Sequence, residues 1–175
     1  MQKLFIIISF VFLFLGQVVY GQVTEKHHSK YAQFYMAEAL YEKEKFSAAQ
    51  AEYEAFMQTI SDVNDPFYVK SKYYYALCAL SLYHPNAEKL LLEFISNYPE
   101  TVYKNNIYLE LGRHYYQRKR CDETIIWFTK IEPLDISEAL RPEYNFKLGY
   151  SYFTENKLKQ ARNLFYDIIN IESPY

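Results

Sequence analysis

A pair of small residues recurs four times along this chain, at a spacing of 36 to 39 residues. The first member of each pair lies inside an aromatic-rich segment of helical periodicity, and the second begins another such segment about a dozen residues later. The first members are Ala37, Ala76, Gly112 and Gly149, and the second members are Ala49, Ala87, Thr124 and Ala161. A period of this length, without strand-like alternation, is typical of stacked helical hairpins. The repeat therefore predicts an all-α superhelical solenoid of about four helical hairpins.

The predicted hairpins cover most of the chain. They span residues 29–61, 66–99, 101–135 and 142–172. Ser47 and Gln50 have the spacing of a capping box, while Asp65 followed by Pro66 suits an N-cap and the first helical position. Composition does not change between the hairpins, so residues 29–175 are predicted to form one repeat domain after a short segment at 22–28.

The small residues have a physical reason, which is the distance between packed helices. Helices pack about 8 to 10 Å apart, and closer approach needs small side chains at the crossing. Gly112 and Gly149 each cost about 1 kcal/mol in helix propensity. A fully buried aromatic side chain stabilises by roughly 1.5 to 3 kcal/mol, which outweighs that cost. We therefore expect an aromatic side chain from the partner helix to fill the space over each glycine.

The first 21 residues are predicted to be a secretory signal peptide. Lys3 gives a positive start, Leu4 to Leu15 is an apolar run, and Gly21 provides a small residue at the cleavage position. The competing interpretation is an uncleaved membrane anchor, but an apolar run of about a dozen residues is shorter than the ~20 that span a bilayer. Cleavage before Gln22 is favoured, which predicts export to the periplasm or cell envelope with no membrane span in the mature chain.

Charge and cysteine usage restrict the partners and the chemistry. The net charge is −2, and no long run of Lys and Arg exists that could neutralise several phosphates. Nucleic-acid binding therefore has no electrostatic support. Cys78 and Cys121 could pair in an exported chain. One is predicted in the middle of a helix and the other in a turn, so two free thiols are favoured.

No motif for catalysis, for a cofactor or for a metal ion occurs in the sequence. A nucleophile elbow and a phosphate-binding loop are both missing, and the chain has only four glycines from which to build one. His27 and His28 are adjacent, and His84 and His114 stand alone, so none follows the spacing of metal ligands. The sequence predicts no enzyme activity, no cofactor and no metal site.

The repeated pattern resembles the tetratricopeptide repeat, in which an aromatic, Leu-Gly and Tyr on a first helix are followed by Ala and an aromatic on a second. The third copy matches with Tyr108, Leu111, Gly112, Tyr115 and Phe128, and the fourth with Leu148, Gly149, Tyr152, Ala161 and Phe165. The second copy needs a one-residue gap, the third has Thr124 in place of Ala, and the period exceeds the family's roughly 34 residues. The whole chain is also similar to the start of larger repeat proteins exported by Bacteroidetes-type bacteria.

The resemblance implies a concave groove lined by the first helices of successive hairpins. By position, these helices would present Tyr31, Phe34, Glu38 and Tyr41; Lys70, Tyr73, Leu77 and Leu80; Asn106, Leu109, Arg113 and Tyr116; and Glu143, Phe146, Tyr150 and Phe153. The candidate partner-binding residues are Tyr31, Phe34, Tyr41, Tyr73, Arg113, Tyr116, Phe146, Tyr150 and Phe153. Aromatic side chains of this kind often dominate protein binding. The alternative is that most of these rings pack between neighbouring hairpins.

These features predict a non-enzymatic scaffold of the bacterial envelope that grips a protein or peptide partner in an aromatic groove. The alternative is a module that binds glycan or peptidoglycan by ring stacking. The one Trp, Trp127, is predicted on a second helix away from the groove, which weighs against sugar binding.

The end of the last predicted helix carries apolar residues that nothing later in the chain would cover. They are Phe165, Ile168, Ile169 and Ile171. Solenoids need a terminal repeat with a polar outer face to stay soluble. We therefore expect further repeats of a longer array at this edge, or else another chain packed against it; the first is favoured.

Overall fold

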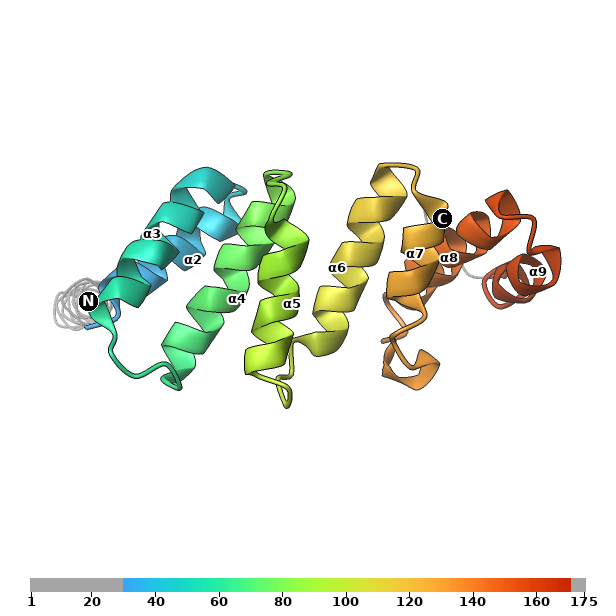
Figure 1. The fold of residues 1–175 in the computed structure, drawn as a ribbon. Helices are drawn as coiled ribbons and strands as arrows, with labels where there is room; N and C mark the ends of the chain where they lie inside the picture. Colours follow the sequence, from blue (N-terminus) through green and yellow to red (C-terminus); the bar gives the residue numbers. More distant parts are fainter. Residues whose placement is uncertain (1–29, 171–175) are drawn as a thin grey trace, which may run out of the picture. The chain divides into compact units, whose positions relative to one another are not determined.

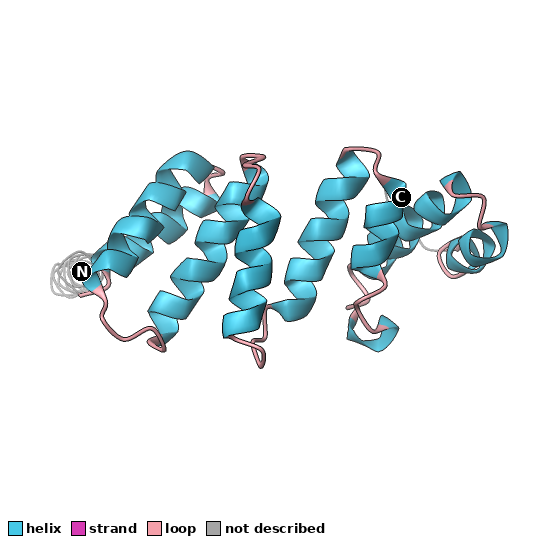
Figure 2. Ribbon diagram, in the orientation of Figure 1, coloured by secondary structure: helices cyan, strands magenta, loops and turns pink. Residues whose placement is uncertain are grey.

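The computed structural model describes residues 30–170, and helices are its regular secondary structure (Figure 2). Within this range, eight α-helices and one 3-10 helix follow one another; Figure 1 shows their order. They are α2 (Ala32–Glu42), α3 (Phe46–Thr59), α4 (Pro66–Ser81), α5 (Ala87–Asn97), α6 (Lys104–Gln117), α7 (Cys121–Phe128), the 3-10 helix η1 (Pro133–Asp135), α8 (Arg141–Thr154) and α9 (Leu158–Tyr166). No strand occurs between residues 30 and 170, so the predicted all-α class is confirmed. The predicted signal peptide, residues 1–21, lies outside the described residues.

The chain divides into two compact units, with the division between His84 and Pro85. The described part of the first unit contains α2, α3 and α4, and α3 packs against both of the others. The second unit contains α5 to α9, in which α6 packs on α7, α7 on α8, and α8 on α9. Within each unit, helices in contact are neighbours or next-but-one neighbours in the chain. The division falls inside the second predicted hairpin, where the sequence shows no change in composition.

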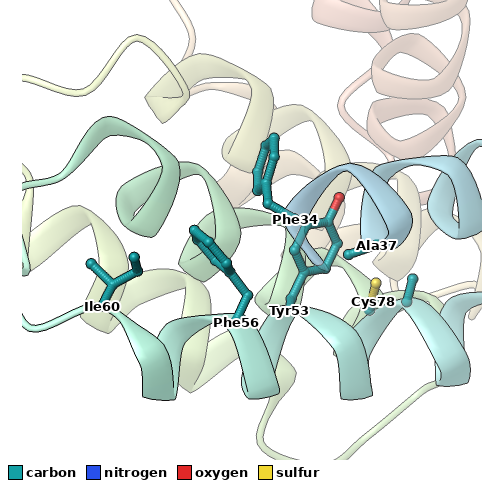
Figure 3. Packing of buried hydrophobic residues seen from close by; sticks show 7 residues of the cluster. Phe34, Ala37, Tyr53, Phe56, Ile60 and Cys78 are labelled. Carbon is teal, nitrogen blue, oxygen red and sulfur yellow. The ribbon is translucent and has the colours of Figure 1, made fainter. Parts of the chain in front are cut away.

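Aromatic rings fill the core of the first unit (Figure 3). Phe34 of α2 meets Tyr53 and Phe56 of α3, with ring centroids 6.1 and 5.7 Å apart. Cys78 of α4 belongs to the same buried cluster. Aromatic pairs at such distances contribute about 0.5–1.5 kcal/mol beyond the burial of their surface. This cluster therefore stabilises the packing of all three helices.

All eight small residues of the repeat are buried. An added Cβ at Gly112 would overlap Cδ1 and Cε1 of Phe128 on α7. At Gly149 it would lie 2.9 Å from Cε1 of Phe165 on α9. Both distances are closer than carbon atoms pack, because optimal contact lies near 3.5–4.0 Å. The prediction that an aromatic side chain fills the space over each glycine is confirmed.

One of the two predicted helix caps is present, and the other is wrong. The Asp65 carboxylate accepts hydrogen bonds from the backbone N–H of Phe67 at 2.8 Å and of Tyr68 at 3.4 Å, as an N-cap should. Ser47 instead lies inside α3, which begins one residue earlier and has no side-chain cap. Its intended partner Gln50 donates to the backbone oxygen of Tyr75 on α4. The tertiary hydrogen bond has replaced the local one.

Four helix ends share one backbone turn that the sequence did not predict. The residue two positions after each helix has a positive φ, between 56° and 59°; these residues are Glu44, Tyr83, Lys119 and Asn156. After α2, the N–H of Glu44 donates to the oxygen of Tyr41, and the N–H of Lys45 donates to the oxygen of Leu40, each at 2.9 Å. The same two bonds recur after α4, α6 and α8. This is the Schellman motif, which ends a helix by satisfying its last carbonyls and is usually built on glycine.

The segment between α7 and α8 packs into the core of the second unit. Ile131 and Ile136 from this segment join a buried cluster with Leu109, Phe128, Tyr144 and Leu148. The hydroxyl of Tyr144 donates to the backbone oxygen of Phe128 at 3.0 Å. The segment therefore fixes the start of α8 against the end of α7.

Candidate functional site

The candidate residues of the first unit are packed among other side chains. Phe34 and Tyr73 are only 1% and 2% exposed, which removes both from the predicted binding surface. The Tyr31 ring stacks on Phe67 with a centroid distance of 4.1 Å, and the Tyr41 ring meets Tyr74 at 4.7 Å. These rings hold α2 against α3 and α4, which is the alternative that the sequence left open.

The candidate residues of the second unit come together on one face of α6 and α8. Tyr116 of α6 meets Tyr150 of α8 edge to face, with ring centroids 5.9 Å apart. Phe146 stacks with Tyr150 at 6.5 Å. Tyr150 is 46% exposed and Phe153 is 58% exposed. We call Tyr116, Phe146, Tyr150 and Phe153 the ring surface.

Helical spacing explains why these side chains share a face. Phe146, Tyr150 and Phe153 follow one another at intervals of four and three residues along α8. Side chains three and four apart lie on the same side of a helix. Gly149 allows α8 to approach Phe165 of α9, and the Phe146 ring meets the Phe165 ring at a centroid distance of 6.3 Å.

A network of charged groups borders the ring surface. The guanidinium of Arg113 donates from Nε to Oε1 of Glu143 at 2.7 Å and from Nη2 to Oε2 at 2.5 Å. Its third nitrogen, Nη1, contacts Oε1 of Glu110 at 2.6 Å. Lys147 donates to Oε1 of Glu143 at 2.5 Å, and its ammonium lies 5.6 Å from the centroid of the Tyr116 ring. Two carboxylates and two cations balance, so the network adds no net charge.

The network also perturbs the ionisation of its members. The pKa of Arg113 is raised above its ordinary value, mainly because its guanidinium donates hydrogen bonds to Glu143. Burial alone would raise the pKa of Glu143, but the hydrogen bonds from Arg113 and Lys147 outweigh it, and the pKa is lowered. All three nitrogens of Arg113 and both carboxylate oxygens of Glu143 are therefore used within the network. This arrangement suits positioning of helices rather than proton transfer.

An ion pair of opposite polarity occupies the same repeat positions in the first unit. Lys70 of α4 donates to Glu38 of α2 at 2.6 Å. Glu38 corresponds by position to Arg113, and Lys70 to Glu143. Sequence reasoning missed both pairs, because it assigned these positions to partner binding. The available signal was opposite charge at matching positions of successive first helices.

The apolar residues predicted to form an uncovered edge do not behave alike. Phe165 lies over Gly149, and Ile168 is buried, which corrects the prediction for these two. Ile169 is exposed, and Ile171 lies outside the described residues.

Residues 30–170 contain no cluster of three His, Cys, Asp or Glu side chains that could hold a metal ion. In the same range, no helix has both the length and the apolar character needed to cross a membrane. No model of a known protein family matches this chain. A search among curated proteins finds no match either.

Proposed function

We propose that this protein is a non-enzymatic scaffold of the bacterial envelope, of the tetratricopeptide type, and that its ring surface holds a segment of a partner protein. The observation that carries the proposal is the pair of exposed aromatic side chains on α8, Tyr150 and Phe153. Tyr and Phe bury large areas with few rotatable bonds, so they are strong anchors for a partner. The leader-like pattern of residues 1–21 supports the envelope location.

The charged network supports the same proposal in a different way. Arg113, Glu143 and Lys147 link α6 to α8 through several hydrogen bonds. Such links hold the rings of the two helices in fixed relative positions before a partner arrives. A preorganised surface loses less conformational entropy on binding.

The glycan-binding alternative has less support. Sugar rings stack best on the open face of an aromatic residue, and Trp is the strongest candidate for that role. Trp127 is 7% exposed and stacks with Tyr108 at a centroid distance of 6.0 Å. The remaining exposed rings of α8 suit a peptide equally well, so no contact favours sugar.

The test compares partner capture by three forms of the mature chain, beginning at Gln22, on envelope extract. These are the wild type, Tyr150→Ala/Phe153→Ala, and a matched control, Tyr83→Ala/Tyr166→Ala, which removes two exposed rings that do not belong to the ring surface. Each captured protein is purified, and its affinity for all three forms is measured by calorimetry. We expect the α8 variant to bind at least tenfold more weakly, because hot-spot residues contribute 2 kcal/mol or more. Equal affinity of all three forms, with unchanged helical circular dichroism, would contradict the proposal.

A further inference from the structure

A cavity of about 400 Å³ lies in the second unit, beside α8 and α9. The segment after α7, one face of α8 and one face of α9 form its walls. The lining is mainly apolar and includes Ile131, Ile136, Leu148 and Leu164. None of the four residues of the ring surface lines it, so the two features are separate.

At three positions that line the cavity, the corresponding residues of the third repeat are two aromatic rings and a cation in mutual contact. In the third repeat, Tyr108 stacks on Trp127 at a centroid distance of 6.0 Å. The ammonium of Lys130 lies 5.4 Å from the Trp127 centroid and 5.9 Å from that of Tyr108. Two rings and a cation thus occupy this place in the third repeat.

The corresponding residues of the fourth repeat all line the cavity. Tyr108, Trp127 and Lys130 are followed 37 residues later by Asn145, Leu164 and Asp167. The same offset relates Gly112 to Gly149 and Phe128 to Phe165, and in both repeats the ring covers the glycine. The correspondence therefore rests on structure as well as on sequence. An amide, a leucine and a carboxylate have replaced two rings and a cation.

The polar groups of the cavity specify what a ligand must offer. Asn145 is only 5% exposed, and no residue in the described range forms a hydrogen bond with its side-chain amide. The amide is not among the fully buried polar atoms that lack a partner, so it is open to the cavity, where a polar ligand group can pair with it. The charged residues of the lining are two carboxylates, Glu132 and Asp167, and one cation, Arg141, whose Nη2 donates to the backbone oxygen of Ile136 at 3.4 Å. The lining therefore carries one excess negative charge.

We propose that this cavity binds a planar aromatic ring that carries both a hydroxyl group and an alkylammonium group. The apolar walls contact the ring, Asn145 pairs with its hydroxyl, and Asp167 attracts the ammonium. The ligand thus supplies the ring and the cation that the third repeat provides from its own chain. Two sources share this chemistry, namely a free aromatic amine and a tyrosine at the amino terminus of a polypeptide. The inference goes beyond the scaffold role and does not depend on the ring surface.

The first experiment titrates the mature chain with tyramine and with p-cresol, which has the same ring and hydroxyl but no ammonium. We expect tyramine to bind several-fold more tightly, and Asp167→Asn to abolish the difference without weakening p-cresol. Glu42→Gln, an exposed carboxylate of α2, is the matched control and should change nothing. Absence of tyramine binding to the wild type, or a preference that survives Asp167→Asn, overturns the proposal.

The second experiment changes the cavity itself. Asn145→Tyr/Leu164→Trp restores the ring pair of the third repeat, and we expect tyramine binding to fall at least tenfold while the helical circular dichroism is retained. Asn145→Leu keeps the volume of the side chain but removes the amide. It should bind tyramine and phenethylamine, which lacks the hydroxyl, with equal affinity, whereas the wild type should prefer tyramine by about three- to tenfold. If Asn145→Tyr/Leu164→Trp binds tyramine as tightly as the wild type, the proposal is overturned. If that variant does not fold, Asn145→Leu decides, and a preference for tyramine over phenethylamine as large as that of the wild type overturns the proposal.

A third titration separates the two sources. The probes are the peptide Tyr-Gly-Gly and its amino-terminally acetylated form. Binding of the free peptide as tightly as tyramine, with loss on acetylation, supports a polypeptide ligand. Binding of tyramine without the peptide supports a small molecule. If neither tyramine nor the free peptide binds, the assignment of the cavity is overturned.

Discussion

Tyr53 differs from its counterparts by a single hydroxyl group. Phe128 and Phe165 occupy the corresponding positions of the third and fourth repeats. The Tyr53 hydroxyl is buried and has no hydrogen-bond partner among the described residues. Burial, with a further contribution from the charge of Glu38, raises its pKa. A buried polar group without a partner destabilises the folded state.

Tyr53→Phe should therefore raise the free energy of unfolding by about 1 kcal/mol, as measured by urea denaturation at neutral pH. Tyr144→Phe is the matched control, because that hydroxyl donates to the backbone oxygen of Phe128. Its removal leaves the buried carbonyl of Phe128 with one hydrogen bond in place of two, the one from the backbone N–H of Ile131 at 3.1 Å, and should cost about 1 kcal/mol. Equal destabilisation by both substitutions would contradict this account of Tyr53.

The positive-φ turns give a second prediction for single residues. Lys119 has a φ of 59°, a conformation that is unfavourable by about 1–2 kcal/mol for a residue with a Cβ. Asn156 has a φ of 58°, but asparagine tolerates this region better than most residues. Lys119→Gly should raise the free energy of unfolding by about 0.5–1 kcal/mol, after the entropic cost of glycine is deducted. Asn156→Gly should change it by a few tenths of a kcal/mol at most. A larger gain at Asn156 than at Lys119, in the same denaturation assay, would count against this explanation.

At the scale of helices, two closely packed crossings differ in how easily they can adjust. Phe128 lies over Gly112, is fully buried and contacts the Tyr144 ring at a centroid distance of 5.1 Å. Phe165 lies over Gly149 and is only partly buried. The Phe165 ring can therefore move aside more easily than the Phe128 ring.

Gly112→Ala should accordingly lower the free energy of unfolding by about 2–3 kcal/mol, because overpacking a well-filled core costs up to this much. Gly149→Ala should cost less than about 1 kcal/mol, since the gain in helix propensity offsets a small displacement of the ring. The double variant Gly112→Ala/Phe128→Leu should recover part of the loss, as measured by thermal unfolding. If the two single alanine variants prove equally stable, the contrast between the crossings is wrong.

The link between α6 and α8 should make stability depend on pH. The pKa of Glu143 is lower in the folded chain than its ordinary value of 4.5. Glu143 therefore contributes stability above pH 4.5, and this contribution is lost as the pH falls below 4.5 through the folded pKa. Glu143→Gln should be less stable than the wild type by about 2 kcal/mol at pH 7. The gap should narrow between pH 4.5 and pH 3, and a gap that widens there would refute the prediction.

The helices could be predicted from the sequence because periodicity and small residues act locally. The Asp65 cap could be predicted because it depends only on residues two and three positions away. The Ser47 capping box failed because Gln50 finds a partner on α4, which local spacing cannot reveal. The four positive-φ turns were missed because their residues are not glycine.

The candidate site was predictable only in part, for a reason that concerns burial. The position of a residue along a predicted helix indicates on which face of that helix its side chain lies. It does not indicate whether a neighbouring helix covers that face. Phe34 and Tyr150 were assigned to one groove, yet the first is buried and the second is exposed. The ion pair between Arg113 and Glu143 forms only because α6 and α8 lie next to each other. The periodicity of one helix does not indicate which other helix it contacts.

At the scale of the whole molecule, the two free thiols fall one in each compact unit. Cys78 is fully buried, and burial raises its pKa to about 12, so its reactive thiolate is scarce at neutral pH. Cys121 is also buried but lies at the start of α7, where a helix end opens more readily than a helix centre. A disulfide reagent applied to the native mature chain should modify Cys121 first and Cys78 only on wider unfolding. Mass spectrometry after timed quenching measures this order, and faster labelling of Cys78 would contradict it.

Contacts between neighbouring helices in each unit also affect how the chain acquires its structure. Among residues 30–170, the helices of each unit pack mainly on helices that are close in the sequence, so little loop-closure entropy is lost before packing begins. A polypeptide of this kind can fold progressively as it is delivered from one end, each new helix docking on one already formed. Such a chain is suited to passage through a narrow pore in the extended state, followed by stepwise assembly on the far side.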